Sequence, residues 1–304
     1  MENWVALENL AGIGRVTCGW KRPELSLDAV RPYWRDAHSP AIARRHGVYE
    51  YRHYALDPVE PDLFAAIEGV ERAPPADQQL MWLSDVRYRD QAGLDAFGAS
   101  PGPQVKAQIL ADIEMIVDKS TTYLVLGDNG RTLVDSSGDP APAGPAAHSY
   151  GVFLKQRGDE AGFRAHVRAM AARWAAGPGV RRLRLNLFEV PDMDAERKAG
   201  YPVKTHPPEM QYQAWIDLAL AGPEAARGLM SPADGLDHAG HLRAVHAYPA
   251  PAVYTFNCAG RPTLAGLRGY PAMAAIRGLD AGHQRDPGLL RWMYGDVAPL
   301  EGVR

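Results

Sequence analysis

The sequence repeats itself once at a nearly constant spacing, and this repeat constrains the fold more than any other feature. Four pairs of positions align in register: Lys21 with Lys155 at a separation of 134 residues, Val30-Arg31 with Phe163-Arg164 at 133, Gly47-Val48 with Gly179-Val180 at 132, and Trp82 with Trp215 at 133. Each pair falls at the same place in the same order of expected elements. We therefore infer two copies of one supersecondary unit.

Hydrophobic alternation, turn residues and caps predict the order β-α-β-β-α-β in each copy. In the first copy we expect strands at 16–22, 48–56, 80–88 and 121–126, with helices after Ser26 and within 105–117. In the second we expect strands at 150–156, 180–190 and 211–220, a last strand within 245–258, a helix after Asp159 and helical residues near 223–229. Ser26 and Asp159 are suitable N-caps, and Pro32 and Pro40 predict an interrupted first helix.

A β-α-β-β-α-β unit places both helices on one face of its sheet, so the other face needs a cover. A second sheet can supply that cover. We predict an α+β fold in which two ferredoxin-like modules form a single-chain dimeric α+β barrel. The expected domains are a first module at 1–127, a Gly- and Pro-rich linker at 128–148, a second module at 149–260 and a C-terminal extension at 261–304.

Composition argues against several classes of partner. The formal net charge is −3, so no positive excess attracts nucleic acid or an anionic membrane surface. No apolar run reaches the roughly 18 residues of a membrane span, and no secretory signal is expected at the start. Cys18 and Cys258 suggest buried, reduced thiols. We expect a cytoplasmic protein that forms homodimers.

One segment carries a family resemblance. Tyr33-Trp34-Arg35-Asp36-Ala37-His38-Ser39-Pro40, followed by Gly47 and a Tyr-rich strand, resembles the signature of EthD-type proteins of the dimeric α+β barrel superfamily. The match covers about the first third of the chain, and the second copy has lost it, with Val167 near the position of Trp34. The resemblance implies acid/base chemistry in a mostly apolar cavity, without metal or organic cofactor. Relatives include polyketide cyclases, accessory proteins of ether degradation, enzymes of aromatic catabolism and cofactor-independent oxygenases.

Histidine and lysine residues are the candidates for acid/base chemistry. His38 could take and return a proton near neutral pH, or could instead fix the turn before Pro40. The segment 201–208 has no counterpart in the first copy and carries Lys204 and His206, which we expect to close over the site as further catalytic residues.

Aromatic and cationic side chains are the candidates for substrate binding. Strand register puts Arg52 and Tyr54 on one face with Arg184, where they could hold an anion; pairing with Glu50 or Asp85 is the structural alternative. The remaining candidates are aromatic, and we expect Trp82 and Trp215 to share that face: Trp34, Trp82, Tyr201, Tyr212 and Trp215.

The combined features favour an enzyme that acts on a small aromatic, phenolic molecule. His238 and His241 would share a helix face, but no third ligand is evident, so we predict no metal and no cofactor. The favoured reaction is a lyase step that breaks a C–C bond and releases a small aldehyde. A cyclase or cofactor-free oxygenase, and a non-catalytic ligand-binding accessory protein, are the alternatives.

Overall fold

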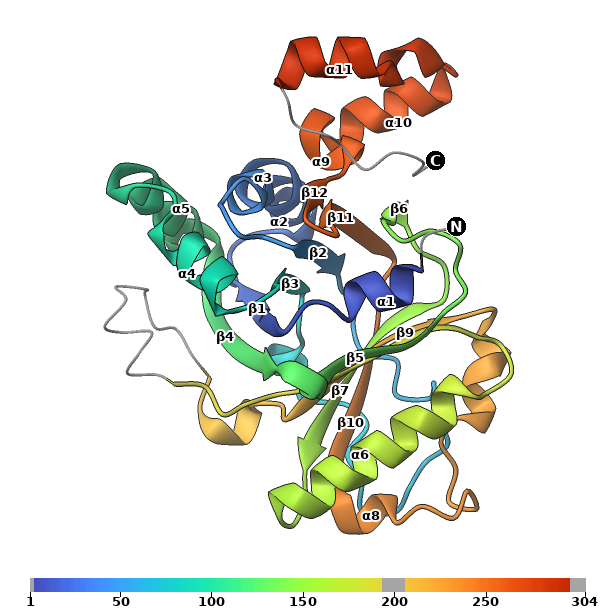
Figure 1. Cartoon of the computed structure of the whole chain (residues 1–304). Helices are drawn as coiled ribbons and strands as arrows, with labels where there is room; N and C mark the ends of the chain where they lie inside the picture. The colour runs from blue at the N-terminus through green and yellow to red at the C-terminus, as the bar shows by residue number, and fades with distance from the viewer. Residues whose placement is uncertain (1–2, 193–205, 296–304) are drawn as a thin grey trace.

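Two antiparallel sheets form the centre of the protein (Figure 1). The structure is a computed structural model, and it describes residues 3–192 and 206–295. The first module contributes β1 (Ile13–Lys21), β2 (Glu50–Ala55), β3 (Trp82–Tyr88) and β4 (Val117–Leu126). The second contributes β7 (Ser149–Gln156), β8 (Val180–Leu187), β9 (Ala214–Leu220) and β10 (Leu242–Pro249).

The two modules have the same strand order. It is β4-β1-β3-β2 in the first sheet and β10-β7-β9-β8 in the second, so both run 4-1-3-2 when the strands are counted within their module. Gly47 and Gly179 precede equivalent strands and both have positive φ, 77° and 82°, a conformation that glycine adopts readily. The predicted fold is confirmed: two ferredoxin-like modules face each other as a single-chain dimeric α+β barrel.

Each module also donates a strand to the other module's sheet. β5 (Gly130–Asp135) follows β4 but pairs with β8, and β11 (Ala252–Cys258) follows β10 but pairs with β2. β6 (Ala143–Pro145) and β12 (Arg261–Pro262) pair with β11. The range expected to be a linker thus contains two strands, and the last expected strand is two strands in different sheets. Edge strands leave backbone groups unpaired, and this exchange covers two such edges.

Helices cover the outer faces of both sheets. The helices that follow the first-module strands are α2 (Leu27–Tyr33), α3 (Ser39–Ala43), α4 (Gln91–Ala99) and α5 (Pro103–Ile116). The second module has α6 (Glu160–Ala175) and α8 (His238–His241); the C-terminal extension has α9 (Leu264–Arg268), α10 (Tyr270–Gly278) and α11 (Pro287–Tyr294). An N-terminal helix, α1 (Trp4–Glu8), lies near β5. Short 3₁₀ turns occur at Ala76–Gln78, Gly127–Asn129, Pro208–Met210, Pro223–Gly228 and Gly282–Arg285.

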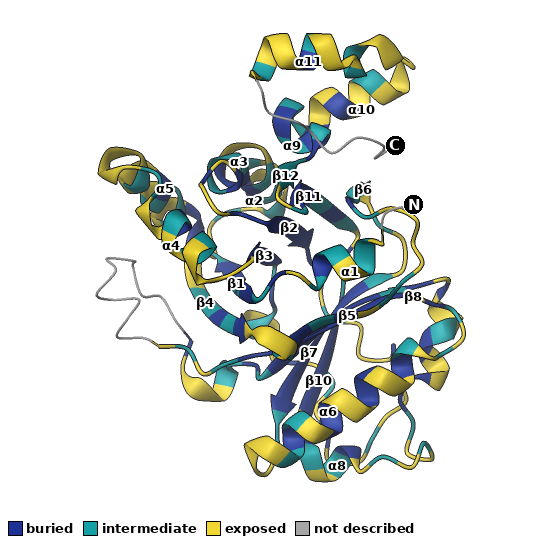
Figure 2. Ribbon diagram, in the orientation of Figure 1, coloured by how far each residue is buried: buried dark blue, intermediate teal, exposed yellow. Residues whose placement is uncertain are grey.

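The core has one layer between the sheets and one beneath each set of helices (Figure 2). The layer between the sheets is strongly aromatic and joins Trp20 and Tyr123 of the first module to Phe153 and Trp215 of the second.

Trp82 and Trp215, which the sequence aligned, are not equivalent. Trp215 pairs across strands with Asn186 and packs between the sheets. At the spacing set by the two equivalent glycines, the matching first-module residue is Leu83, which pairs with Tyr54. The alignment was therefore wrong by one residue. A one-residue slip moves a strand side chain to the opposite face, so Trp82 points toward the helices instead.

Candidate functional site

A cavity of about 120 Å³ lies between the first sheet and its covering helices. Its wall is mostly apolar and aromatic, with a few polar groups. The aromatic residues and the histidine that line it are Trp34, His38, Tyr51, Trp82, Tyr88 and Phe97. A concave, largely apolar space with a few converging polar groups is the usual form of a small-molecule site.

The segment that resembles the EthD signature forms one wall of this cavity. α2 ends at Tyr33, and a π-helical turn, Trp34–His38, leads into α3, whose second residue is Pro40. Proline cannot donate its backbone nitrogen to the preceding turn, so the regular helix is interrupted there. Single π-helical turns of this kind are frequent at functional sites. Here the turn stacks the His38 ring on the Trp34 indole, with centroids 4.1 Å apart and planes at 25°.

His38 is oriented by a carboxylate from α5. Its Nδ1 lies 3.3 Å from Oδ2 of Asp112, and the Tyr33 hydroxyl donates to Oδ1 of the same carboxylate at 2.7 Å. Burial lowers the pKa of His38 below its ordinary value, and the Asp112 carboxylate opposes that shift. The ring is therefore neutral at neutral pH. Because Nδ1 faces Asp112, Nε2 is the nitrogen left to act on a ligand.

Two hydroxyl groups connect the aromatic wall to the sheet. The Trp34 indole donates to Oγ of Ser84 at 3.3 Å, and the Tyr51 hydroxyl donates to Oγ of Ser39 at 2.8 Å. Burial raises the pKa of Tyr51 to about 12, so this phenol keeps its proton. These bonds fix the rings beside His38 and limit their rotation.

Trp82 forms another part of the wall. Its ring centroid lies 4.9 Å from that of Trp34, and its buried Nε1 has no hydrogen-bond partner among the described residues. Gly19 on β1 makes room for this indole, since a Cβ at Gly19 would lie only 2.1 Å from the ring. A donor without a partner at a cavity wall can serve a bound oxygen atom.

The predicted anion-binding residues lie elsewhere. Arg52, Tyr54 and Arg184 face the space between the sheets, where the Tyr54 hydroxyl donates to Asp217 at 3.0 Å. The Nε of Arg52 lies 2.9 Å from Oε1 of Glu50, as the structural alternative anticipated. Trp215 is buried between the sheets and makes an edge contact with Tyr54. The structure does not bring these side chains to the His38 cavity.

The predicted second-module residues are also separate from His38. Tyr212 is buried between the sheets and bonds through its hydroxyl to Nδ1 of His246 at 2.8 Å. The His206 ring is buried against Trp20, on the barrel side of β1, and burial lowers its pKa to about 4. Tyr201 and Lys204 lie outside the described residues. The expected joint site of His38, Lys204 and His206 is therefore not assembled from the residues that can be placed.

No group of three or more His, Cys, Asp or Glu side chains in ranges 3–192 and 206–295 is placed to share a metal ion. His238 bonds instead to Asp234 at 2.8 Å and to His166 at 3.1 Å. No helix in the same ranges combines the length and apolarity of a membrane span.

Sequence reasoning missed Asp112, Tyr51 and Ser84 as neighbours of His38. Asp112 lies within the helix expected at 105–117, and Tyr51 and Ser84 lie on two expected strands. Periodicity placed the elements, but it could not show which helix covers which strands. Contacts across 74 residues of sequence, such as that of His38 with Asp112, are set by packing.

Comparison with known proteins finds only distant likenesses to solved structures. No protein-family model and no curated protein matches the chain. A monooxygenase candidate from Lactobacillus acidophilus is similar with a TM-score of 0.41 and 10% identity, covering 81% of this chain and 97% of the other. One from Fusobacterium nucleatum has a TM-score of 0.45, 9% identity and coverage of 82% and 96%. An anthrone oxidase-like protein has a TM-score of 0.44, 10% identity and coverage of 81% and 93%. At these values the likenesses carry no argument about this chain.

Proposed function

We propose that this protein is an enzyme that uses His38 as a general base on a small phenolic molecule bound in the first-module cavity. The observation that carries the proposal is the buried His38 ring, neutral at neutral pH, oriented by Asp112 and stacked on Trp34 inside an aromatic cavity. A neutral imidazole can take the proton of a phenol, whose pKa lies near 10 in water. The EthD-like segment supports the same cavity as the site of the reaction, because it supplies both Trp34 and His38.

Cavity size favours a substrate with a single aromatic ring. The volume is about 120 Å³, and an engineered protein cavity of about 150 Å³ is known to bind benzene. A fused polycyclic molecule would exceed this space. This makes cyclisation of a large aromatic polyketide the weaker of the alternatives.

The number of acid/base groups favours oxygenation over the lyase step. Aldehyde expulsion needs a base at one position and an acid that protonates the carbon left behind. Among the described residues that line the cavity, His38 is the one histidine, and none is Asp, Glu, Cys or Lys. Oxygenation of a phenol that has a free para position needs one base. The phenolate, one dioxygen and the proton held by His38 give a quinone and one water, and the substrate supplies all the electrons.

Dioxygen uptake by the purified protein tests this proposal. We expect a single-ring phenol to be consumed with one equivalent of dioxygen, and His38→Gln to lower the rate by about 10²–10⁴-fold. His206→Gln is the matched control, because this second buried histidine lies on the other face of the sheet; it should leave the rate unchanged.

Three other outcomes would redirect the assignment. Consumption of substrate with aldehyde release and no dioxygen uptake would establish the lyase instead. Binding of phenols without turnover, equal in wild type and His38→Gln, would indicate the accessory role. Full activity in His38→Gln would remove His38 from the chemistry.

A further inference from the structure

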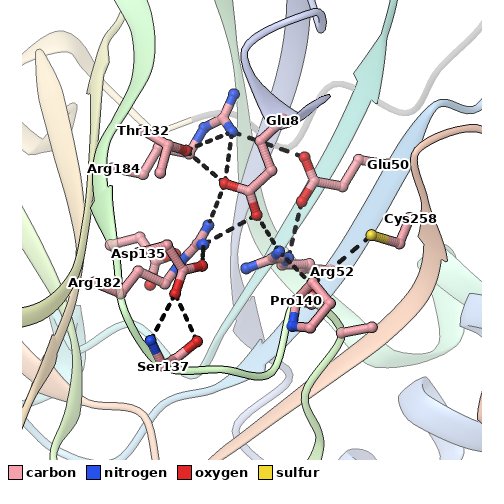
Figure 3. A network of polar contacts seen from close by, with 12 residues as sticks. Glu8, Glu50, Arg52, Thr132, Asp135, Ser137, Pro140, Arg182, Arg184 and Cys258 are labelled. Carbon is pink, nitrogen blue, oxygen red and sulfur yellow. Dashed lines mark hydrogen bonds and ion pairs between the residues drawn. The ribbon is translucent and has the colours of Figure 1, made fainter. Parts of the chain in front are cut away.

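Three arginines from both sheets converge on one carboxylate at an end of the barrel (Figure 3). The carboxylate is that of Glu8. It is contacted by Arg52 of the first sheet and by Arg182 and Arg184 of the second. Arg182 binds it with both terminal nitrogens, at 3.0 and 3.1 Å, and Thr132 donates its hydroxyl at 2.5 Å. This is the geometry in which guanidinium groups recognise a planar carboxylate.

Glu8 precedes β1, the first strand of the repeated β-α-β-β-α-β unit. It is the last residue of α1, a helix of five residues, and only 4% of its surface is exposed. Burial alone would raise the pKa of Glu8, but Arg182, Arg52 and Arg184 together hold it well below its ordinary range. The surroundings therefore favour a negative charge at this point strongly.

Arg184 has more donors than Glu8 uses. Its Nη1 faces Glu8 at 3.5 Å and Thr132 at 3.0 Å, but its buried Nε and Nη2 have no hydrogen-bond partner among the described residues. The residue is 1% exposed, so bulk water does not satisfy these groups. Unpaired guanidinium donors in a buried site are costly and favour an acceptor.

A larger cavity adjoins the cluster. Its volume is about 330 Å³, and Arg52 and Arg182 line it together with the serines at 136 and 137. It is lined by two of the three arginines, Arg52 and Arg182, and by no described residue of α1.

We propose that this end of the barrel is a carboxylate-binding site, which Glu8 occupies in cis and which a small monocarboxylate can occupy when Glu8 is absent. A monoanion suits the site better than a phosphate dianion, because Asp135 and Asp217 already neutralise part of the charge of Arg182. The site is distinct from the His38 cavity, which lies on the other face of the first sheet.

Thermal unfolding of Glu8→Ala in sodium acetate and in sodium chloride of equal ionic strength tests the proposal. Acetate should raise the Tm of this variant in a saturable way, by about 5 °C or more near saturation, since a ligand that binds only the folded state stabilises it. Wild type, Glu8→Gln (which fills the site with a neutral side chain) and the exposed-site control Glu24→Ala should show no such difference. Glu8→Ala combined with Arg184→Met should lose the acetate response.

Equal Tm values of Glu8→Ala in the two salts would overturn the proposal, as would an equal acetate response in wild type. Should Glu8→Ala not fold in chloride, the fraction that refolds after denaturation becomes the measurement. Recovery that depends on acetate supports the site. The same failure in both salts contradicts it.

Discussion

The two modules share one architecture, but the space beneath their helices differs. In the first module that space holds the cavity around His38. In the second it is filled by Phe163, Met170 and Trp174, which recur at helical spacing on α6 and are buried. At the spacing that aligns Val30 with Phe163, Trp34 corresponds to Val167 and His38 to Ala171, both buried in that core.

The first module itself helps to fill the second. Leu63 and Phe64, from the segment between β2 and β3, pack into the core beneath α6, and the Phe64 ring lies 5.0 Å from that of Trp174. Backbone bonds from Glu60 to Ala247 and from Glu71 to Arg243 attach this segment beside β10. The second module is thus filled beneath its long helix, while the first has a cavity beneath its helices. The cavity around His38 is therefore lined by first-module residues.

Removing a large side chain from the core beneath α6 should have the largest effect on stability. Trp174→Ala removes a fully buried indole, and we expect a loss of about 3–5 kcal/mol in unfolding free energy. Turnover per folded molecule should not change, because the residue lies outside the His38 cavity. Denaturant unfolding and activity measured on the same preparation check both parts. A selective loss of activity would show that the second module does more than support the first.

Adding a methyl group at the wall of the His38 cavity should have the next largest effect on stability. In Gly19→Ala the new methyl group meets the Trp82 indole, so the ring has to move, and we expect a cost of about 1–3 kcal/mol with weaker binding of phenols. Titration with a phenol, followed by tryptophan fluorescence, measures the binding. Gly98→Ala is the matched control because a Cβ there meets nothing within 4 Å. Unchanged phenol binding in Gly19→Ala would place the ligand away from Trp82.

Filling the first module should make it resemble the second. Val86 lines the cavity, and Val86→Phe should occupy part of it. We expect stability to rise by about 0.5–2 kcal/mol, as cavity-filling substitutions commonly do, while turnover falls. Thermal unfolding and initial rates test this pair of opposite changes. Retention of full activity would argue that the cavity is not the active site.

Removing the partner of His38 should have the smallest effect, seen in the pH profile. His38 must be neutral to act as a base, so kcat/KM should fall as pH drops through its pKa, which lies below the usual 6.5. Asp112 raises that pKa, so Asp112→Asn should move the acid limb to lower pH. Tyr33→Phe, which removes a neighbouring hydroxyl but keeps the carboxylate, serves as the comparison. An acid limb that stays in place in Asp112→Asn would mean that another group titrates there.

Local features of the sequence determined the elements and the class of fold. Alternation, caps and turn glycines act over a few residues, so β-α-β-β-α-β could be derived twice, with Ser26 and Asp159 as the observed N-caps. The helical spacing of Phe163, Met170 and Trp174 on α6 follows from the same short-range rules, as does the interruption of the helix before Pro40. His38 and Trp34 stand together in the site because they are neighbours in one helical segment.

Tertiary structure alone decided the rest. Three features join residues that are far apart in the chain. They are the exchange of β5 and β11 between the sheets, the contact of Asp112 with His38, and the convergence of arginines on Glu8. Strand register decided which side of the sheet each candidate faces. The sequence alignment was one residue out of register, so Trp82 and Trp215 lie on non-equivalent faces of their sheets. Long-range packing sets these contacts and registers, and residue spacing in a single sequence does not predict them.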